Sequence, residues 1–176
     1  MNLQLANIWL PTGAELQLFS PELVLVGTIV AVLLVPLFVG RRSQVAAMVA
    51  LLGALVGVLA TARIAGLVTD GGLGGLAPPG HPPMLIADRF SIFFKLFLFV
   101  LLAAIVWLWL TGTIQRRMLP SGRALGEVGG PEFFLLLLTS ALGMMLMVGS
   151  LNLLVIIIAM VTASLPSYAI VASDKR

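Results

Sequence analysis

Charged residues are scarce in this sequence. Asp, Glu, Lys and Arg make up only 10% of the 176 residues, whereas a soluble globular domain carries about 25%. A surface with so few charges cannot be solvated by water over most of its area. The shortage therefore excludes an ordinary soluble domain.

Cysteine is absent, and histidine occurs once, at His81. The missing thiols exclude disulfides, thiolate-bound iron–sulfur clusters and cysteine zinc sites within this chain. One imidazole does not make a metal site, so we expect no metal and no cofactor in this chain. The glycines at positions 72 and 74 lack the third glycine of a dinucleotide-binding turn, and no Gly-Lys-Ser/Thr follows them.

Long apolar runs are what the sequence does contain. Hydrophobic residues make up 60% of the chain, and the mean hydropathy is +1.15. A membrane crossing takes about 20 apolar residues. We expect an all-α polytopic membrane protein with five transmembrane helices, over residues 22–40, 44–67, 87–112, 131–148 and 151–171.

These helices divide the chain into four parts. Residues 1–21 form an N-terminal extramembrane segment, and 22–112 hold three leading helices with a Gly/Pro-rich loop at 68–84. The loop composition predicts neither helix nor strand. A loop at 113–131 precedes two further helices over 131–172. Because no Lys or Arg precedes Arg41, the N-terminus lacks the basic region of a signal peptide, and we expect the first helix to remain uncleaved.

The basic residues predict an orientation. A net charge of +3 would suggest nucleic acid as the partner of a soluble domain, but here the charges are scattered between apolar runs. If positions 41, 42, 116, 117, 123, 175 and 176 face the cytoplasm, seven of the ten basic residues obey the positive-inside rule. We therefore expect an outside N-terminus, a cytoplasmic 113–131 loop and C-terminal end, and no nucleic-acid partner.

Lys95 is the most informative charged residue, because it falls about two turns into the third helix. An ammonium at membrane depth must face protein, water or a counter-ion. One interpretation makes Lys95 part of a proton or ion path; the other is a side chain that snorkels to the headgroups. Glu132, at the start of the fourth helix, is interpreted as an interfacial acid favoured by the helix dipole.

Small residues form two stripes that permit close helix packing. Gly53 and Gly57 are four residues apart in the second helix, and Ala159 and Ala163 repeat this spacing in the fifth. Both stripes predict close helix packing and indicate no catalytic or binding site.

One face of the fifth helix carries Val161, Ser164 and Tyr168. Pro166 kinks this helix, removes one backbone hydrogen bond and is expected to leave the carbonyl of Thr162 free. The result is a locally polar spot, but none of these groups titrates near neutral pH. Ser164 and Tyr168 are therefore candidate lining groups of a path, together with Lys95.

The C-terminal 46 residues resemble a known family. The segments 143–147 (GMMLM), 152–154 (NLL) and 164–168 (SLPSY) are similar to chain N of bacterial NADH-quinone oxidoreductase, respiratory complex I. Upstream, residues 88–95 are similar to the start of the family's third helix, and residues 20–22 (SPE) to its opening. The resemblance thus places the chain at the N-terminal part of this antiporter-like subunit.

The resemblance implies a subunit of about fourteen helices in which two inverted five-helix repeats meet at a midplane ion path. Such a subunit lies in the bacterial inner membrane and has no redox centre. Its partners are the lipid bilayer and the other membrane subunits of the complex, and it meets quinone only indirectly. The implied function is a membrane-arm component of a proton-translocating NADH:quinone oxidoreductase.

Two departures from the family pattern weaken pumping by this chain alone. The family's buried Glu lies three residues before the Ser-Leu-Pro, and that position is Val161 here. A valine cannot hold a proton, so no catalytic residue is carried over. The sequence also ends after the family's fifth helix, with an incomplete repeat, and we expect the isolated chain to be poorly stable.

Two alternatives remain at this stage. One is a subunit of a multi-subunit cation/proton antiporter, whose large subunits share this ancestry. The other is an accessory membrane protein that has lost transport, and Val161 supports this alternative because it replaces the family's Glu. Neighbouring genes discriminate chain N from the antiporter, because chain N lies among quinone oxidoreductase subunits and the antiporter among its own small subunits. A native complex that contains this chain with no complementary fragment would favour the accessory protein.

Overall fold

A computed structural model describes residues 13–38, 43–67, 74–76, 85–117 and 130–173 of the chain. It contains five helices long and apolar enough to cross a membrane. Their bounds follow: α2 Ser20–Phe38, α3 Ser43–Leu67, α4 Arg89–Arg117, α5 Pro131–Gly149 and α6 Leu153–Ser173. The predicted all-α polytopic fold with five membrane helices is therefore confirmed.

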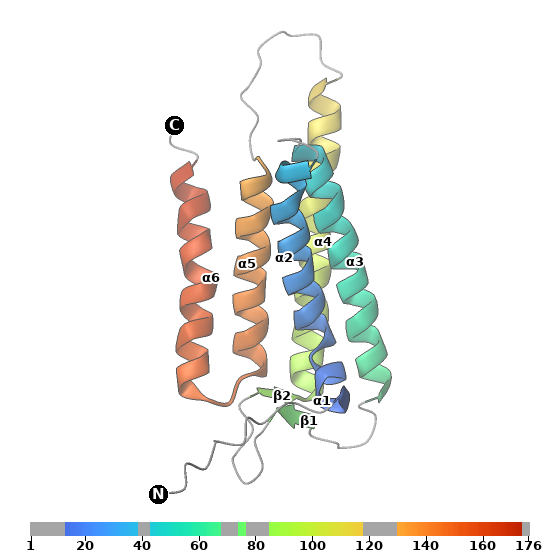
Figure 1. The fold of residues 1–176 in the computed structure, drawn as a ribbon, viewed down its shortest axis with the longest axis vertical. Coiled ribbons are helices and arrows are strands. Elements are labelled where there is room, and N and C mark those ends of the chain that lie inside the picture. Colours follow the sequence, from blue (N-terminus) through green and yellow to red (C-terminus); the bar gives the residue numbers. More distant parts are fainter. Residues whose placement is uncertain (1–12, 39–42, 68–73, 77–84, 118–129, 174–176) are drawn as a thin grey trace, which may run out of the picture.

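Successive membrane helices run in opposite directions, so the ends of the bundle differ (Figure 1). At one end lie the short helix α1 (Gly13–Leu18) and the strands β1 (Gly74–Leu76) and β2 (Leu85–Ala87). We call this the strand end. The first residues of α2, α4 and α6 lie there, whereas their last residues lie at the opposite end.

The strands correct two expectations from the sequence. Residues 74–76 lie in the loop predicted to be free of helix and strand, yet β1 pairs with β2 in an antiparallel register. Two glycines pair here because the ladder uses only backbone N–H and C=O groups. Ala87 ends β2 and does not begin the third membrane helix, and Leu85 also forms an antiparallel bridge with Ser150.

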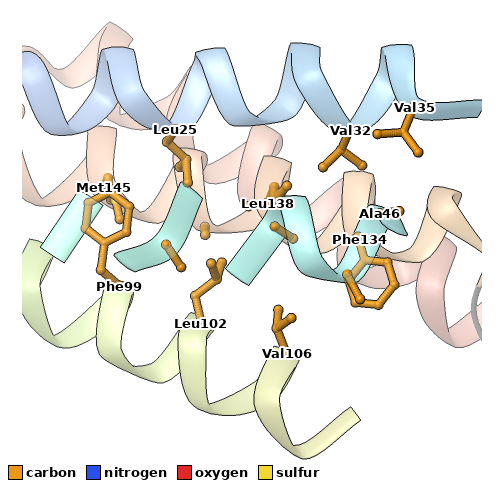
Figure 2. Close-up of a cluster of buried hydrophobic side chains, with 14 residues drawn as sticks. Leu25, Val32, Val35, Ala46, Phe99, Leu102, Val106, Phe134, Leu138 and Met145 are labelled. Carbon is orange, nitrogen blue, oxygen red and sulfur yellow. The ribbon is translucent and has the colours of Figure 1, made fainter. Parts of the chain in front are cut away.

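Four helices surround the main core. Leu25 and Val32 of α2 point toward Leu102 of α4, with Phe134 and Leu138 of α5 beside them (Figure 2). All five side chains are buried. The apolar core thus joins the three leading helices to α5.

The glycine stripe of α3 makes two different contacts. A Cβ at Gly53 would collide with the Thr28 side chain of α2, and one at Gly57 would collide with the Phe99 ring of α4. The predicted close packing is therefore present, and α3 uses it toward two neighbours.

Helix α6 packs against α5 at the edge of the bundle (Figure 1). A Cβ at Gly143 would lie 2.5 Å from the Ala163 nitrogen and 2.8 Å from the Ala159 carbonyl oxygen. The predicted Ala159/Ala163 stripe is thus the surface that meets α5. Most of the remaining surface of α6 is exposed and apolar.

Candidate functional site

The first turn of α4 is closed by a reciprocal cap. The Ser91 N–H donates to Asp88 Oδ1 at 2.7 Å, and the Asp88 N–H donates to Ser91 Oγ at 3.1 Å. A capping residue and a partner three residues later satisfy two backbone donors in this way. Asp88 therefore fixes where α4 begins, which determines the depth of the residues that follow.

Lys95 lies one further turn along the same face of α4 and is buried in an ion pair. Its Nζ is 2.6 Å from Oε1 of Glu22, and Lys95 is only 1% exposed. Glu22 is in the first turn of α2 and is 8% exposed. Because α2 and α4 both start at the strand end, the two opposite charges meet at one depth (Figure 1).

Two further groups surround the Lys95 ammonium. The Phe19 ring centroid is 5.7 Å from Nζ, within cation–π range. A Cβ at Gly149 would lie 3.6 Å from Nζ, so the ammonium lies against the last residue of α5. The final carbonyls of a helix carry partial negative charge. The cation is thus held between a carboxylate, an aromatic ring and a helix C-terminus.

The sequence singled out Lys95 but missed its partner. The snorkelling interpretation is wrong, because the ammonium is turned inward to Glu22 and does not reach the outer surface. Glu22 was noted only as part of residues 20–22, which resemble the family's opening. The available signal was that the first and third helices run parallel, so an acid and a base near their starts lie at similar depth.

A second polar cluster lies between α5 and α6, near Pro166. The Ser140 and Ser167 hydroxyls donate to the Ala163 carbonyl at 2.9 and 3.0 Å, and the two hydroxyl oxygens are 3.2 Å apart. This cluster differs from the polar spot predicted beside Pro166, which involved Ser164 and Tyr168. The cluster involves the Ala163 carbonyl, where the sequence had suggested that of Thr162.

The candidate lining residues of α6 lie on the face away from α5. Val161 is 48% exposed and Tyr168 70% exposed. The half-buried Ser164 donates its hydroxyl to the Val161 carbonyl in its own helix. Within the described residues the structure brings Lys95 together with Glu22 and not with Ser164 or Tyr168.

The remaining candidates concern metals and interfacial acids. Among the described residues, no three His, Cys, Asp or Glu side chains gather as a metal site would require. His81 lies outside the described residues. Glu132 is exposed in the first turn of α5, at the end of the bundle opposite the Glu22–Lys95 pair.

Comparison with known proteins gives consistent relatives. No family model matches the chain. The chain is 34% identical over 161 residues to NADH-quinone oxidoreductase subunit N of Rubrobacter xylanophilus, covering 89% of this chain and 29% of that protein. It is 31% identical over 163 residues to the subunit N of an Anaeromyxobacter species, covering 89% and 27%. A subunit N from Coxiella burnetii is 35% identical over 89 residues, which cover 51% of this chain and 16% of that protein. The chain thus spans less than a third of the length of these relatives.

Proposed function

The chain is a partial subunit N-like protein, as its resemblance to the chain N family predicted, and from this premise we propose a role in the membrane arm of a proton-translocating NADH:quinone oxidoreductase. The observation that carries the proposal is 34% identity over 89% of the chain to a protein of that name. In this role the chain has no redox centre, contacts the other membrane subunits, and meets quinone only indirectly.

The role that we propose for this chain is structural. The chain contributes no more than a segment of a proton path. Val161 occupies the position of the family's buried Glu, and a valine side chain has no ionisable group. We infer that the chain alone does not pump protons. Another protein segment must therefore cover the exposed α6 face before Ser164 and Tyr168 can line a proton path.

The proposal includes an orientation in the bacterial cell membrane. The helix ends that flank Arg41, Arg42, Arg116 and Arg117, and the end of α6, lie opposite the strand end (Figure 1). This arrangement supports a cytoplasmic location for that end by the positive-inside rule. The strand end then faces outside.

The decisive experiment is purification from the native membrane. The chain carries an affinity tag, membranes are solubilised in mild detergent, and native gels are stained for NADH dehydrogenase activity. We expect the tagged chain to migrate with the activity, and its deletion to lower NADH-driven proton uptake by membrane vesicles. Migration apart from all NADH dehydrogenase activity contradicts the proposal.

The same gels separate the two alternatives. Co-purification with small subunits of a cation/proton antiporter, with Na⁺-dependent or K⁺-dependent proton exchange, supports the antiporter. A complex without either activity supports an accessory protein that has lost transport, the alternative that the valine at position 161 favours.

A further inference from the structure

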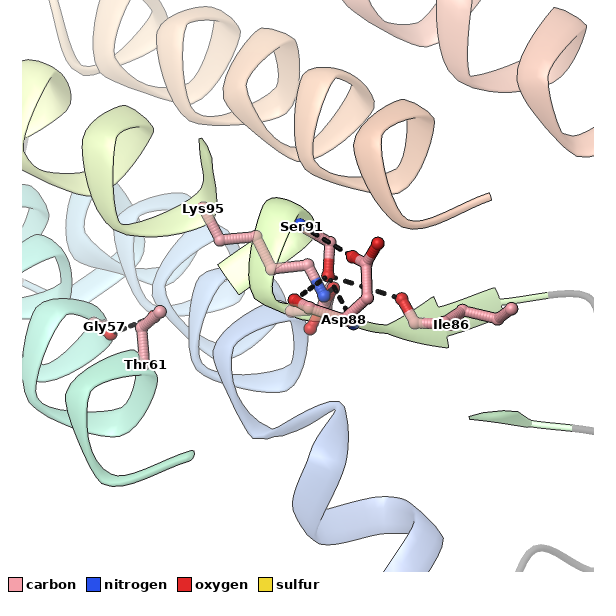
Figure 3. Close-up of polar contacts among 7 residues, drawn as sticks. Gly57, Thr61, Ile86, Asp88, Ser91 and Lys95 are labelled. Atoms are coloured by element: carbon pink, nitrogen blue, oxygen red, sulfur yellow. Dashed lines mark hydrogen bonds and ion pairs between the residues drawn. The ribbon is translucent and has the colours of Figure 1, made fainter. Parts of the chain in front are cut away.

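The buried face at the start of α4 is polar and begins at the half-buried Asp88. Asp88, Ser91 and Lys95 follow one another at spacings of three and four residues, so they share one face of the helix. Asp88 is half-buried, whereas Ser91 and Lys95 are buried (Figure 3). A row of hydrogen-bonding groups thus leads from the strand end into the bundle.

Beyond Lys95 the same face becomes apolar. Phe99, Leu102 and Val106 follow at the same spacings, and each is at most 3% exposed (Figure 2). They pack in the main core against Leu25 and Leu138. The polar row therefore stops at the ion pair, and this face offers no polar continuation toward the opposite end.

Glu22 has an oxygen that the ion pair does not use. Oε1 contacts Lys95, whereas Oε2 is buried and has no hydrogen-bond partner within the described part of the chain. An ionised carboxylate accepts hydrogen bonds or a proton at either oxygen. Oε2 is therefore an acceptor in the interior whose capacity is unused by the protein.

Few other charges act on this acceptor. In α3, α4 and α5, the described ionisable groups are Lys95 itself, the exposed Arg89 and Arg63, Arg116 and Arg117 in the last turn of α4, and Glu132 at the far end. Asp88 precedes α4 and is engaged as its cap. Helix α1 adds one acid by sequence, Glu15. The Lys95 ammonium is in direct contact with the Glu22 carboxylate.

We propose that Glu22 and Lys95 form a proton-binding site that is accessible only from the strand end. A proton from water at that end adds to Glu22 Oε2 and forms an O–H bond, while Lys95 remains an ammonium. The charge of the pair changes from zero to +1. The C-terminus of α5 at Gly149 and the Phe19 ring then stabilise the released cation.

The test follows the Glu22 carboxyl group by infrared spectroscopy. The full chain, carrying ¹³C at its Glu carboxyl carbons, is inserted into liposomes in one orientation, which is read from a Ser121→Cys label. On acidification at the strand end we expect reversible loss of a carboxylate band and gain of a carboxylic-acid band, both missing in Glu22→Gln. Acidification at the opposite end leaves these bands unchanged.

Matched variants separate proton binding from a structural salt bridge. Glu132→Gln removes an acid at the opposite end and leaves the Glu22 bands intact. Lys95→Arg keeps a cation and retains the response. Circular dichroism at each pH confirms that the variants remain folded.

Two results overturn the proposal. If the Glu22 carboxylate persists at every pH at which the chain stays folded, the pair is a structural ion pair only. If acid from either end protonates Glu22 equally, access is not one-sided. None of these measurements uses NADH or quinone, so their outcome is independent of the proposed enzyme.

Discussion

At the scale of single residues, the Glu22–Lys95 pair decides how strongly α2 and α4 hold together at the strand end. Breaking a buried pair leaves one charge uncompensated, which typically costs about 3–5 kcal/mol. We expect Lys95→Met to lower the free energy of unfolding by about this amount. Replacing both partners, as in Glu22→Leu with Lys95→Met, should return stability close to that of the wild type, because no buried charge is left.

Unfolding by SDS in mixed micelles, followed by tryptophan fluorescence, measures these differences. Arg63→Met is the matched control, because Arg63 is an exposed base in a neighbouring helix and should change stability by less than about 0.5 kcal/mol. If the double variant is as unstable as Lys95→Met alone, side-chain packing and not charge compensation determines the loss of unfolding free energy.

Val161 permits a second test at this scale. It lies near the middle of α6, on the exposed face, where an ionised group facing lipid costs about 2.5–3.5 kcal/mol. Val161→Glu should therefore weaken membrane insertion of the isolated chain. If partner subunits cover this face and form a polar path there, the same variant should still assemble into the complex.

Met160→Glu is the matched control for position 161, one residue earlier on an exposed surface of α6. Assembly yield on native gels compares the two. We expect Met160→Glu to lose assembly and Val161→Glu to retain it. Equal loss in both variants would indicate that position 161 faces lipid in the complex.

Sequence reasoning reached part of this candidate site. Lys95 stands out because a lysine inside an apolar run is costly unless it is paired. Glu22 did not stand out, since an acid in a first turn has a sufficient local explanation in the helix dipole. Its contact with Lys95 arises from packing of two helices distant in sequence, which local patterns do not encode.

At the scale of the elements, the contact of α5 with α6 depends on the missing side chain of Gly143. The atoms that a Cβ would meet belong to the backbone of α6 and cannot rotate away. We expect Gly143→Ala to push the two helices apart and to destabilise their packing by about 1–3 kcal/mol. The Ser140 hydroxyl would also lose its bond to the Ala163 carbonyl.

Spin labels on introduced cysteines report the distance between α5 and α6, and the natural absence of cysteine keeps the labelling specific. Gly27→Ala is the control, because a Cβ there meets no atom within 4 Å. It should leave the distance unchanged. An unchanged distance in Gly143→Ala would mean that the helices do not need this close approach.

The membrane helices were predictable as elements, whereas the strands were not. Each helix is a long apolar run, so hydropathy locates it within a few residues. Strand β1 contains two glycines, and its pairing depends on the backbone of β2 farther along the chain. Composition carries no signal for such pairing. The start of α4 also required the Asp88–Ser91 cap, which moves it two residues beyond the predicted boundary.

At the scale of the whole molecule, four helices share a core, and α6 is added at the edge through α5. The order of the helices along the chain was predictable, but their side-by-side arrangement was not. Helices that are apolar all round have no polar face to show which side turns inward. Among the described residues, small side chains, a few buried hydroxyls and the buried Glu22 and Lys95 distinguish one side of a helix from another.

The orientation of the bundle is a prediction at this scale. We expect the strand end outside and the opposite end in the cytoplasm, because most basic residues flank the latter. In intact cells a membrane-impermeant thiol reagent should label Gly75→Cys. It should label Ser121→Cys only after the membrane is permeabilised.

The cysteine-free wild type provides the background for both variants. Labelling of Ser121→Cys in intact cells, with protection of Gly75→Cys, would reverse the orientation. It would also place the Glu22–Lys95 pair near the cytoplasmic surface.

The position of Glu22 also has a consequence during synthesis. Glu22 precedes Lys95 by 73 residues, the difference between the two positions. At about 5–20 residues per second, the ribosome needs roughly 4–15 s to supply the partner. Throughout this interval the translocon must hold a first helix whose acid has no counter-ion. An acid in the first turn of that helix can stay hydrated in the headgroup layer, and it becomes buried only when α4 is inserted and packs beside it.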